Sequence, residues 1–440
     1  MRRLVHVVMC GSTAAILIVL ARFQATSRSR VRYVDLIDNR WLVAYGLLCL
    51  AAAYGVGLPD VAMSKSRLVA SAVLAPLLAA AVFAFVATAV GPWLLPRFVV
   101  TAAPLFLAPI YGVCSLISRS NWDRRVSKER VLLISHNEEA LKITRELDGA
   151  TERPASLVGL LTVSDANPTR TCPAPVAAAA ADNKATLVVL SEEAQASEAI
   201  IEQVAVLHEG GVRVRPVTVF YDEWLGKLPL HELTRMHLMF DIGEVHTSVY
   251  GRLKRFVDVV CALLGLPLLV VVSPAIALAN AISSRGPLLF GQDRVGLNGK
   301  TFRIHKFRTM LPRSESAGEW TQRDDPRITP VGRLLRSTHI DELPQLWNIL
   351  VGDLSLVGPR PEQVHYVSEL SAKIPHYSLR HTVRPGLTGW AQVKYPYGSN
   401  DADALEKLEF DLYYLGHQGP GLDVKIVSRT IRSLIDRRGV

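Results

Sequence analysis

DPRITPVGRLLRSTHIDELPQLWNILVGDLSLVGPRPE, residues 325–362, is the stretch around which the whole chain is organised. Two neighbouring carboxylates, Asp341 and Glu342, stand near its middle, with arginines on both sides of them. Arginine side chains bind phosphate oxygens through paired hydrogen bonds, and carboxylates can hold a divalent metal or attack phosphorus. The stretch therefore predicts a site for phosphate chemistry.

Composition points to a membrane protein with an anionic partner. The 440 residues suggest two or three domains, and the apolar share of 49% with a mean hydropathy of +0.22 indicates membrane segments. The net charge of +9 fits lipid headgroups and phosphorylated substrates. A nucleic-acid partner would rest on charge alone, and we expect none. The five cysteines form no C-x-x-C pair, which argues against a zinc site or a disulfide framework.

Four apolar stretches open the chain, and each approaches the length of about 20 residues that spans a bilayer. They cover residues 5–21, 41–57, 68–90 and 98–117. A cluster of lysine and arginine follows the fourth stretch, which places the rest of the chain in the cytoplasm by the positive-inside rule. We therefore assign residues 1–120 to four transmembrane helices. The first loop is also rich in arginine, so either the first stretch does not span or this loop is an exception.

Residues 121–250 change to strands that alternate with helices. Expected strands cover residues 131–135, 156–163, 185–190 and 212–219, with helices at 138–147 and 193–208. Such alternation predicts a parallel sheet in a cytoplasmic, Rossmann-like α/β domain. The turn after the first strand reads SHNEE and lacks the glycines that approach a pyrophosphate, which argues against dinucleotide binding. A regulatory or scaffolding role is the favoured interpretation.

Residues 251–285 form a further apolar run that is long enough to span a membrane. Lys254 and Arg255 stand at its start, where we expect them at anionic headgroups. Pro267 and Pro274 interrupt the helical hydrogen bonds, and Ser273 can satisfy a freed carbonyl. We therefore predict a re-entrant membrane helix whose two ends both lie in the cytoplasm.

Residues 286–440, the expected catalytic domain, lack another spanning run. Together with the apolar run before them, from Lys254 onward, they resemble the bacterial sugar transferases, which are polyprenyl-phosphate hexose-1-phosphate transferases. The resemblance extends over nearly 190 residues, and the layout ahead of it is similar to the long form of the family, which takes part in exopolysaccharide biosynthesis. The matching blocks are Lys254-Arg255-Phe256, Phe290-Gly291-Gln292-Asp293-Arg294-Val295-Gly296, Lys306-Phe307-Arg308-Thr309-Met310, Asp341-Glu342-Leu343-Pro344-Gln345-Leu346, Gly358-Pro359-Arg360-Pro361, Arg384-Pro385-Gly386-Leu387-Thr388-Gly389-Trp390 and Phe410-Asp411-Leu412-Tyr413-Tyr414.

The resemblance implies a fold and a reaction. It implies a mainly α catalytic domain at the bacterial inner membrane, on its cytoplasmic face, which moves a sugar-1-phosphate from a UDP-sugar to undecaprenyl phosphate and releases UMP. Glucose or galactose is the family expectation, with an N-acetylated sugar as the alternative, and a homo-oligomer is compatible with it. A non-catalytic membrane scaffold is the competing hypothesis from another class.

The resemblance also implies roles for individual residues. Asp341 would be the nucleophile, forming an acyl-phosphate, and Glu342 would hold Mg²⁺. Arg336 and Arg360 would clamp phosphate oxygens, and as nearby cations they would keep Asp341 ionised. Substrate-binding roles are carried over for three further residues, with alternatives left open. They are Lys306 and Arg308, which either contact phosphate or form structural salt bridges, and Asp411, which could instead brace Arg360 or Arg384.

Overall fold

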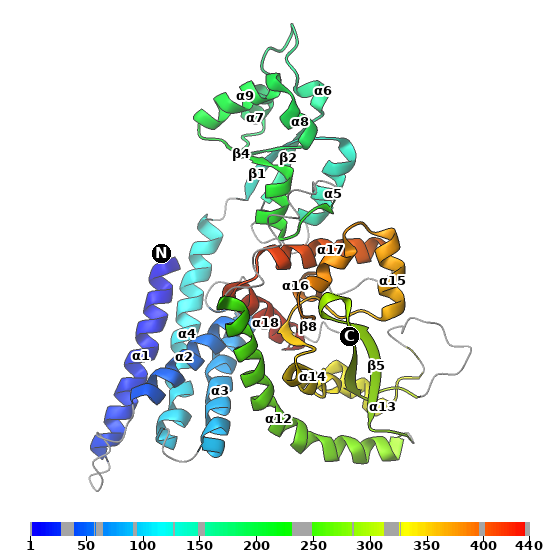
Figure 1. Ribbon diagram of the computed structural model, residues 1–440. Helices are drawn as coiled ribbons and strands as arrows, with labels where there is room; N and C mark the ends of the chain where they lie inside the picture. Colours follow the sequence, from blue (N-terminus) through cyan, green and yellow to red (C-terminus); the bar gives the residue numbers. More distant parts are fainter. Residues whose placement is uncertain are drawn as a thin grey trace. The chain divides into compact units, whose positions relative to one another are not determined.

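The chain forms two compact units, Met1–Val126 with Val427–Asp436 and Ser127–Ile426 with Arg437–Val440. Figure 1 shows a computed structural model of the chain. The structure describes residues 2–27, 39–56, 58, 65–90, 95–125, 128–147, 155–230, 249–283, 286–311, 325, 327–395 and 401–435.

All four apolar stretches predicted near the N-terminus are helical. They form α1 (Arg2–Ser27), α2 (Asn39–Val56), α3 (Lys65–Val90) and α4 (Arg97–Arg125), which share one apolar core. Polar side chains join these helices inside the core, since the Tyr45 hydroxyl donates to the Val100 carbonyl at 3.0 Å. In the described part of the chain, Val5–Gln24, Arg97–Ile117 and Tyr250–Ser283 are long and apolar enough to cross a membrane, whereas Arg40–Gly55 and Leu68–Ala84 are shorter.

The predicted parallel sheet is present in the second unit. Its strands run in the order β2-β1-β3-β4, and every pairing is parallel. Alternate residues of β1 and β3 point to opposite faces, and each face carries its own apolar cluster. The elements are β1 (Glu129–Ile134), α5 (Asn137–Leu147), β2 (Ala155–Leu161), α6 (Val163–Ala166), α7 (Pro175–Asp182), β3 (Leu187–Leu190), α8 (Glu192–Ala196), α9 (Glu198–Glu209) and β4 (Arg213–Pro216).

One predicted strand is wrong in its second half. The strand expected over residues 212–219 stops at Pro216, and α10 (Val217–Phe220) and the π-helical turn η2 (Tyr221–Leu225) follow. The physical reason is a helical spacing of apolar residues, because Val217, Phe220, Tyr221 and Trp224 lie at i, i+3, i+4 and i+7 and are all buried. Burial of one helical face therefore outweighs the preference of the local β-branched residues for a strand.

Helix α12 (Val249–Ser283) contains the predicted interruption. It carries Pro267 and Pro274, and the Ser273 hydroxyl donates to the Leu269 carbonyl at 2.6 Å. Figure 1 shows α12 as a bent helix, which the two prolines explain because each removes one backbone donor. Large apolar side chains on α12, such as Val271 and Ile282, are exposed, as expected in lipid. That both ends of α12 face the cytoplasm stays a prediction.

The C-terminal part of the chain, from β5 onward, is mainly helical, as predicted, with two short sheets. The strands β5 and β6 form an antiparallel hairpin, and β7 pairs with β8 in parallel. The elements are β5 (Leu289–Val295), β6 (Thr301–Phe307), α13 (Pro330–Ser337), α14 (Gln345–Val351), β7 (Ser355–Val357), α15 (Val364–Lys373), η7 (Tyr377–Thr382), β8 (Gly386–Thr388), α16 (Trp390–Lys394), α17 (Asp401–Gly416) and α18 (Pro420–Ile435).

A buried lysine joins the α/β sheet region to the C-terminal helices within this unit. Lys227, whose side chain is 2% exposed, lies 2.7 Å from Glu146 of α5 and 3.3 Å from both Glu406 and Glu409 of α17. Beside it, the Trp390 indole donates to the Gly226 carbonyl at 2.6 Å. The segment after η2 is thus held to α17 by charge and to α16 by a buried hydrogen bond.

Candidate active site

The two carboxylates at the centre of the sequence lie on a single turn of 3₁₀-helix. This turn, η6 (Ile340–Glu342), follows His339, which adopts a left-handed backbone conformation with φ 55°. Non-glycine residues rarely adopt this conformation, and a residue that does so cannot continue a right-handed helix. Helix α13 therefore ends before Asp341. Pro344 then precedes α14, a position that suits proline because its fixed φ angle fits the start of a helix.

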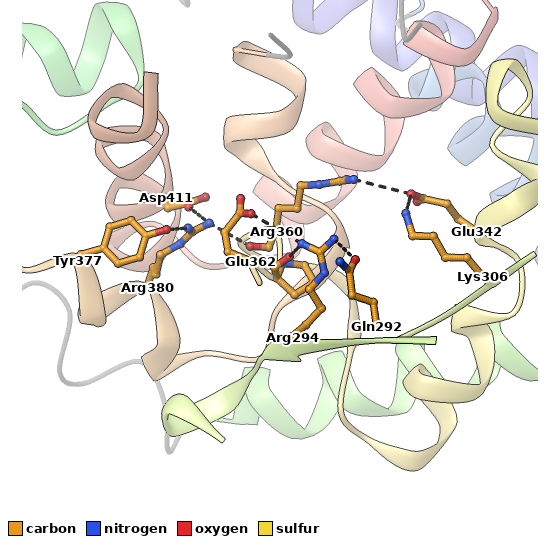
Figure 2. Close-up of polar contacts among 10 residues, drawn as sticks. Gln292, Arg294, Lys306, Glu342, Arg360, Glu362, Tyr377, Arg380 and Asp411 are labelled. Atoms are coloured by element: carbon orange, nitrogen blue, oxygen red, sulfur yellow. Dashed lines mark hydrogen bonds and ion pairs between the residues drawn. The ribbon is translucent and has the colours of Figure 1, made fainter. Parts of the chain in front are cut away.

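Glu342 is the centre of a charged cluster drawn from three segments. The Lys306 ammonium of β6 donates to Glu342 Oε1 at 2.5 Å, and Arg360 Nη2 lies 3.9 Å from the same oxygen (Figure 2). Burial would raise the pKa of Glu342, but these two cations outweigh it and lower the pKa to about 2. Glu342 is therefore an anion throughout the physiological pH range.

Asp341 differs from its neighbour in ionisation. Burial, and next the like charge of Glu342, raise the pKa of Asp341 above its ordinary value, although Lys306, His339 and Arg336 act in the opposite direction. The expectation that cations keep the pKa of Asp341 low is therefore wrong for the net shift, although Arg336 acts in the expected direction. The physical reason is that Arg360 approaches Glu342 and that Asp341 is 8% exposed.

Arg336 and Arg308 occupy different surroundings. Arg336 lies in the last turn of α13, close enough to Asp341 to act on its carboxyl. Arg308 is buried, and its guanidinium packs against Gly286, where no Cβ would fit. The structure therefore brings Lys306, Arg336 and Arg360 to the carboxylate pair and places the Arg308 side chain against the chain that precedes β5.

Asp411 lies outside the Glu342 cluster. It forms an ion pair with Arg380 at 2.8 Å in which both side chains are buried, and burial raises the pKa of Asp411 to about 6 despite that partner (Figure 2). Of the alternatives weighed for Asp411, bracing is the one that this geometry matches. However, its partner is Arg380, which the sequence did not single out, and neither Arg360 nor Arg384.

Lys254 and Arg255, the cations at the start of α12, bind groups of the protein itself. Lys254 pairs with Asp423 at 2.6 Å, and Arg255 donates to the Ile349 and Leu350 carbonyls at the end of α14. Both also line a cavity of about 550 Å³ together with Arg384. We expected these two side chains to lie at lipid headgroups. In the structure, protein carboxylate and carbonyl groups bind them instead.

The carboxylate pair fits a magnesium ion better than it fits a metal that takes three or more ligands from protein side chains. No group of three or more His, Cys, Asp or Glu side chains that could hold a metal is found among the described residues. Mg²⁺ commonly uses one or two carboxylates and completes its shell with water and substrate phosphates. In the described chain both cations approach Oε1 of Glu342, and no donor reaches Oε2.

Known proteins match the part of the chain that carries this site. The model of the bacterial sugar transferase family matches residues 249–437. A UDP-N-acetylgalactosamine-undecaprenyl-phosphate N-acetylgalactosaminephosphotransferase of Aeromonas hydrophila is 44% identical over 190 residues, 43% of this chain and 45% of that protein. A UDP-glucose:undecaprenyl-phosphate glucose-1-phosphate transferase of Caulobacter vibrioides is 45% identical over 219 residues, 48% of this chain and 82% of that protein.

A shorter relative falls almost entirely within the match. The exopolysaccharide production protein PSS of Rhizobium leguminosarum is 38% identical over 192 residues, 42% of this chain and 96% of that protein. In contrast, the match spans less than half the length of the Aeromonas relative. The similarity covers β5 to α18 and α12, which are the elements that build the Glu342 cluster and its surroundings. The chain therefore belongs to the bacterial sugar transferase family.

Proposed function

We propose that this chain transfers a sugar-1-phosphate from a UDP-sugar to undecaprenyl phosphate at the cytoplasmic face of a bacterial inner membrane, as an early step in exopolysaccharide synthesis. The observation that carries the proposal is the Asp341–Glu342 pair with Lys306 and Arg360 at Glu342. Glucose or galactose is the proposed sugar. The exposed apolar face of α12 supports a site that a lipid substrate can reach.

In the first step, the Asp341 carboxylate attacks the phosphorus that bears the sugar. A bond forms between the Asp341 oxygen and phosphorus as the bond to the UMP oxygen breaks, and UMP leaves with the electron pair. Arg360 and Arg336 bind the phosphate oxygens on which charge gathers. The low pKa of Glu342 keeps a permanent negative charge beside the nucleophile, so Asp341 is held at higher energy as an anion.

In the second step, an oxygen of undecaprenyl phosphate attacks the same phosphorus. The bond to Asp341 breaks, the carboxylate is regenerated, and the product is a polyprenyl-diphosphate sugar. Both steps use the same cations because both place charge on the same phosphate oxygens. Glu342, to which no protein donor is bound at Oε2 in the described chain, would hold Mg²⁺. When bound, this ion neutralises negative charge on the diphosphate and on the departing UMP.

The test is transfer by the full-length chain in membranes. Membranes that contain the chain are incubated with undecaprenyl phosphate, Mg²⁺ and a panel of radiolabelled UDP-sugars, and label in the lipid fraction and UMP release are measured together. We expect labelled lipid and one UMP for each sugar transferred, and loss of both when a chelator removes divalent ions. Failure of every donor to give labelled lipid would reject the proposed function.

The pH dependence of the first step follows from the raised pKa of Asp341. The attacking carboxylate must be ionised, so the rate of UMP release is expected to fall on acidification at a higher pH than an ordinary aspartate would require. Single-turnover UMP release between pH 4 and 8 measures this limb, with tryptophan fluorescence as the control for acid unfolding. A rate that stays constant down to pH 4 would contradict the assignment of the raised pKa to the nucleophile.

A further inference from the structure

The backbone of residues 359–362 is held by a complete series of hydrogen bonds. Four consecutive carbonyls each accept one, although they belong to a short segment between a strand and a helix. The donors are Gly386 N to Pro359 at 2.9 Å, Arg380 Nη2 to Arg360 at 3.0 Å, Arg294 Nη1 to Pro361 at 3.1 Å and Val295 N to Glu362 at 3.0 Å.

Two of these four donors are arginine side chains from distant parts of the sequence. Arg380 belongs to η7, and its guanidinium also donates to the Tyr377 hydroxyl at 2.6 Å and pairs with Asp411 of α17. Both partners of that pair are almost completely buried, at 6% and 1% side-chain exposure. A buried guanidinium with three fixed partners has a single orientation, so the Arg360 carbonyl is held in a single place.

Arg294 provides the second side-chain donor from the β5 strand. Its guanidinium donates to Gln292 at 2.7 Å and to the Pro361 carbonyl, and it lies 3.8 Å from Glu362 (Figure 2). Arg294 and Arg380 thus donate hydrogen bonds to the carbonyls of two adjacent peptide groups. The side chain of Arg360 starts at the α-carbon that directly precedes the first of these peptide groups, and it extends to Glu342.

We infer that Arg294 and Arg380 are positioning residues that fix the backbone of Arg360 so that its guanidinium is delivered to the phosphate site, and that Asp411 acts by orienting Arg380. This inference rests on the proposed function. In this inference Asp411 supports the site without contacting the substrate. Arg294 and Arg380 support it in the same way, and neither contacts a reacting group.

The local sequence explains why side-chain donors are needed here. Pro359 and Pro361 have no backbone N–H, so this segment cannot join a regular ladder on that side. Their fixed φ angles limit the chain, and the arginine donors then remove the remaining freedom of the carbonyls. A long arginine side chain that must meet a phosphate in a transition state gains most from a rigid starting point, because misplacement of about 1 Å can cost about 100-fold in rate.

A double-mutant cycle separates positioning from general stabilisation. The variants Arg360→Gln, Arg380→Gln and the combination of both are compared with the wild-type full-length chain in single-turnover UMP release. Arg360→Gln is expected to lower the rate about 100- to 1,000-fold, as removal of an oxyanion-binding donor does. Arg380→Gln alone is expected to lower it by about 100-fold. Arg380→Gln in the Arg360→Gln background is expected to change it less than about two-fold.

The matched control is Arg213→Gln, which removes an arginine that pairs with Glu129 in the sheet region. Its transfer rate is expected to stay at the wild-type value. Effects of Arg360→Gln and Arg380→Gln that multiply in the double variant would overturn the inference, because they would show that Arg380 acts independently of Arg360. An inactive wild-type chain would instead reject the proposed function, so the two failures are distinguishable.

Arg380→Gln leaves buried Asp411 without its partner, which can prevent folding. A milder variant therefore tests the inference in a chain that still folds. Tyr377→Phe keeps the ion pair and removes only the hydroxyl that orients Arg380. We expect this variant to melt near the wild-type temperature and to lower kcat about 10-fold with little change in KM, and to have no added effect in the Arg360→Gln background. The same kcat loss in both backgrounds would overturn the inference.

Discussion

Replacing Asp341 by asparagine is expected to reduce sugar-phosphate transfer by about four orders of magnitude or more, the scale on which removal of a covalent nucleophile acts. Asparagine has nearly the same shape and keeps the fold, but its amide oxygen carries no charge to attack phosphorus. Transfer to undecaprenyl phosphate by membranes that contain the variant measures the effect. The matched control is Asp353→Asn from the same stretch of sequence, which is expected to keep wild-type activity.

The same variant tests the covalent step directly. Wild-type chain that is given a labelled UDP-sugar without undecaprenyl phosphate is expected to become labelled and to release UMP in equal amount. Asp341→Asn is expected to do neither. Mass spectrometry of the labelled peptide locates the adduct. Label on Glu342, or full transfer by Asp341→Asn, would contradict the role of Asp341 as the nucleophile, and the first result would exchange the roles of the two carboxylates.

Replacing Lys227 by methionine is expected to lower the free energy of unfolding by about 3–5 kcal/mol, the cost of removing one partner from a buried ion cluster. Methionine fills much of the same volume, so the effect comes from charge. Glu146, Glu406 and Glu409 would face each other without the ammonium that now lies within 2.7–3.3 Å of each of them. Because Glu146 and Glu409 are also largely buried, solvent cannot take over this role.

Thermal unfolding of the full-length chain in lipid nanodiscs measures this loss. We expect Lys227→Met to lower Tm by on the order of 10 °C, given the size of the unit. Lys373→Met is the control, since Lys373 is exposed and its pair with Glu369 contributes about 0.5 kcal/mol or less. Adding Glu409→Gln to Lys227→Met is expected to recover part of the loss by removing one of the three carboxylate charges that then repel each other. Equal Tm values for the two lysine variants would contradict the buried cluster.

Much of the architecture follows from local patterns. The apolar stretches near the N-terminus are helical, the alternation after them forms a parallel sheet, and Pro267 and Pro274 accompany a bend in α12. These features depend on hydrophobic periodicity and on proline, which act over a few residues. The strand expected over residues 212–219 is wrong in its second half for the same kind of reason, since a helical period that begins at Val217 buries Phe220 and Trp224.

The sign of the Asp341 pKa shift is a through-space property. An arginine five residues before Asp341 suggests a lowered pKa, and Arg336 does act in that direction. Burial and the charge on Glu342 outweigh it. No count of neighbouring cations in the sequence could have predicted this outcome, because desolvation depends on what covers the carboxyl group after folding.

The sequence by itself determined that Asp341 and Glu342 are adjacent, that a helix starts after Pro344, and that cations flank the pair. Covalent neighbours and short-range backbone rules decide these points. Only the tertiary structure decided which cations meet which carboxylate. Lys306 reaches Glu342 across 36 residues, and Asp411 reaches Arg380 from another helix. These pairings require strands, loops and helices to be packed first, because ion pairs form between groups that folding brings together and buries.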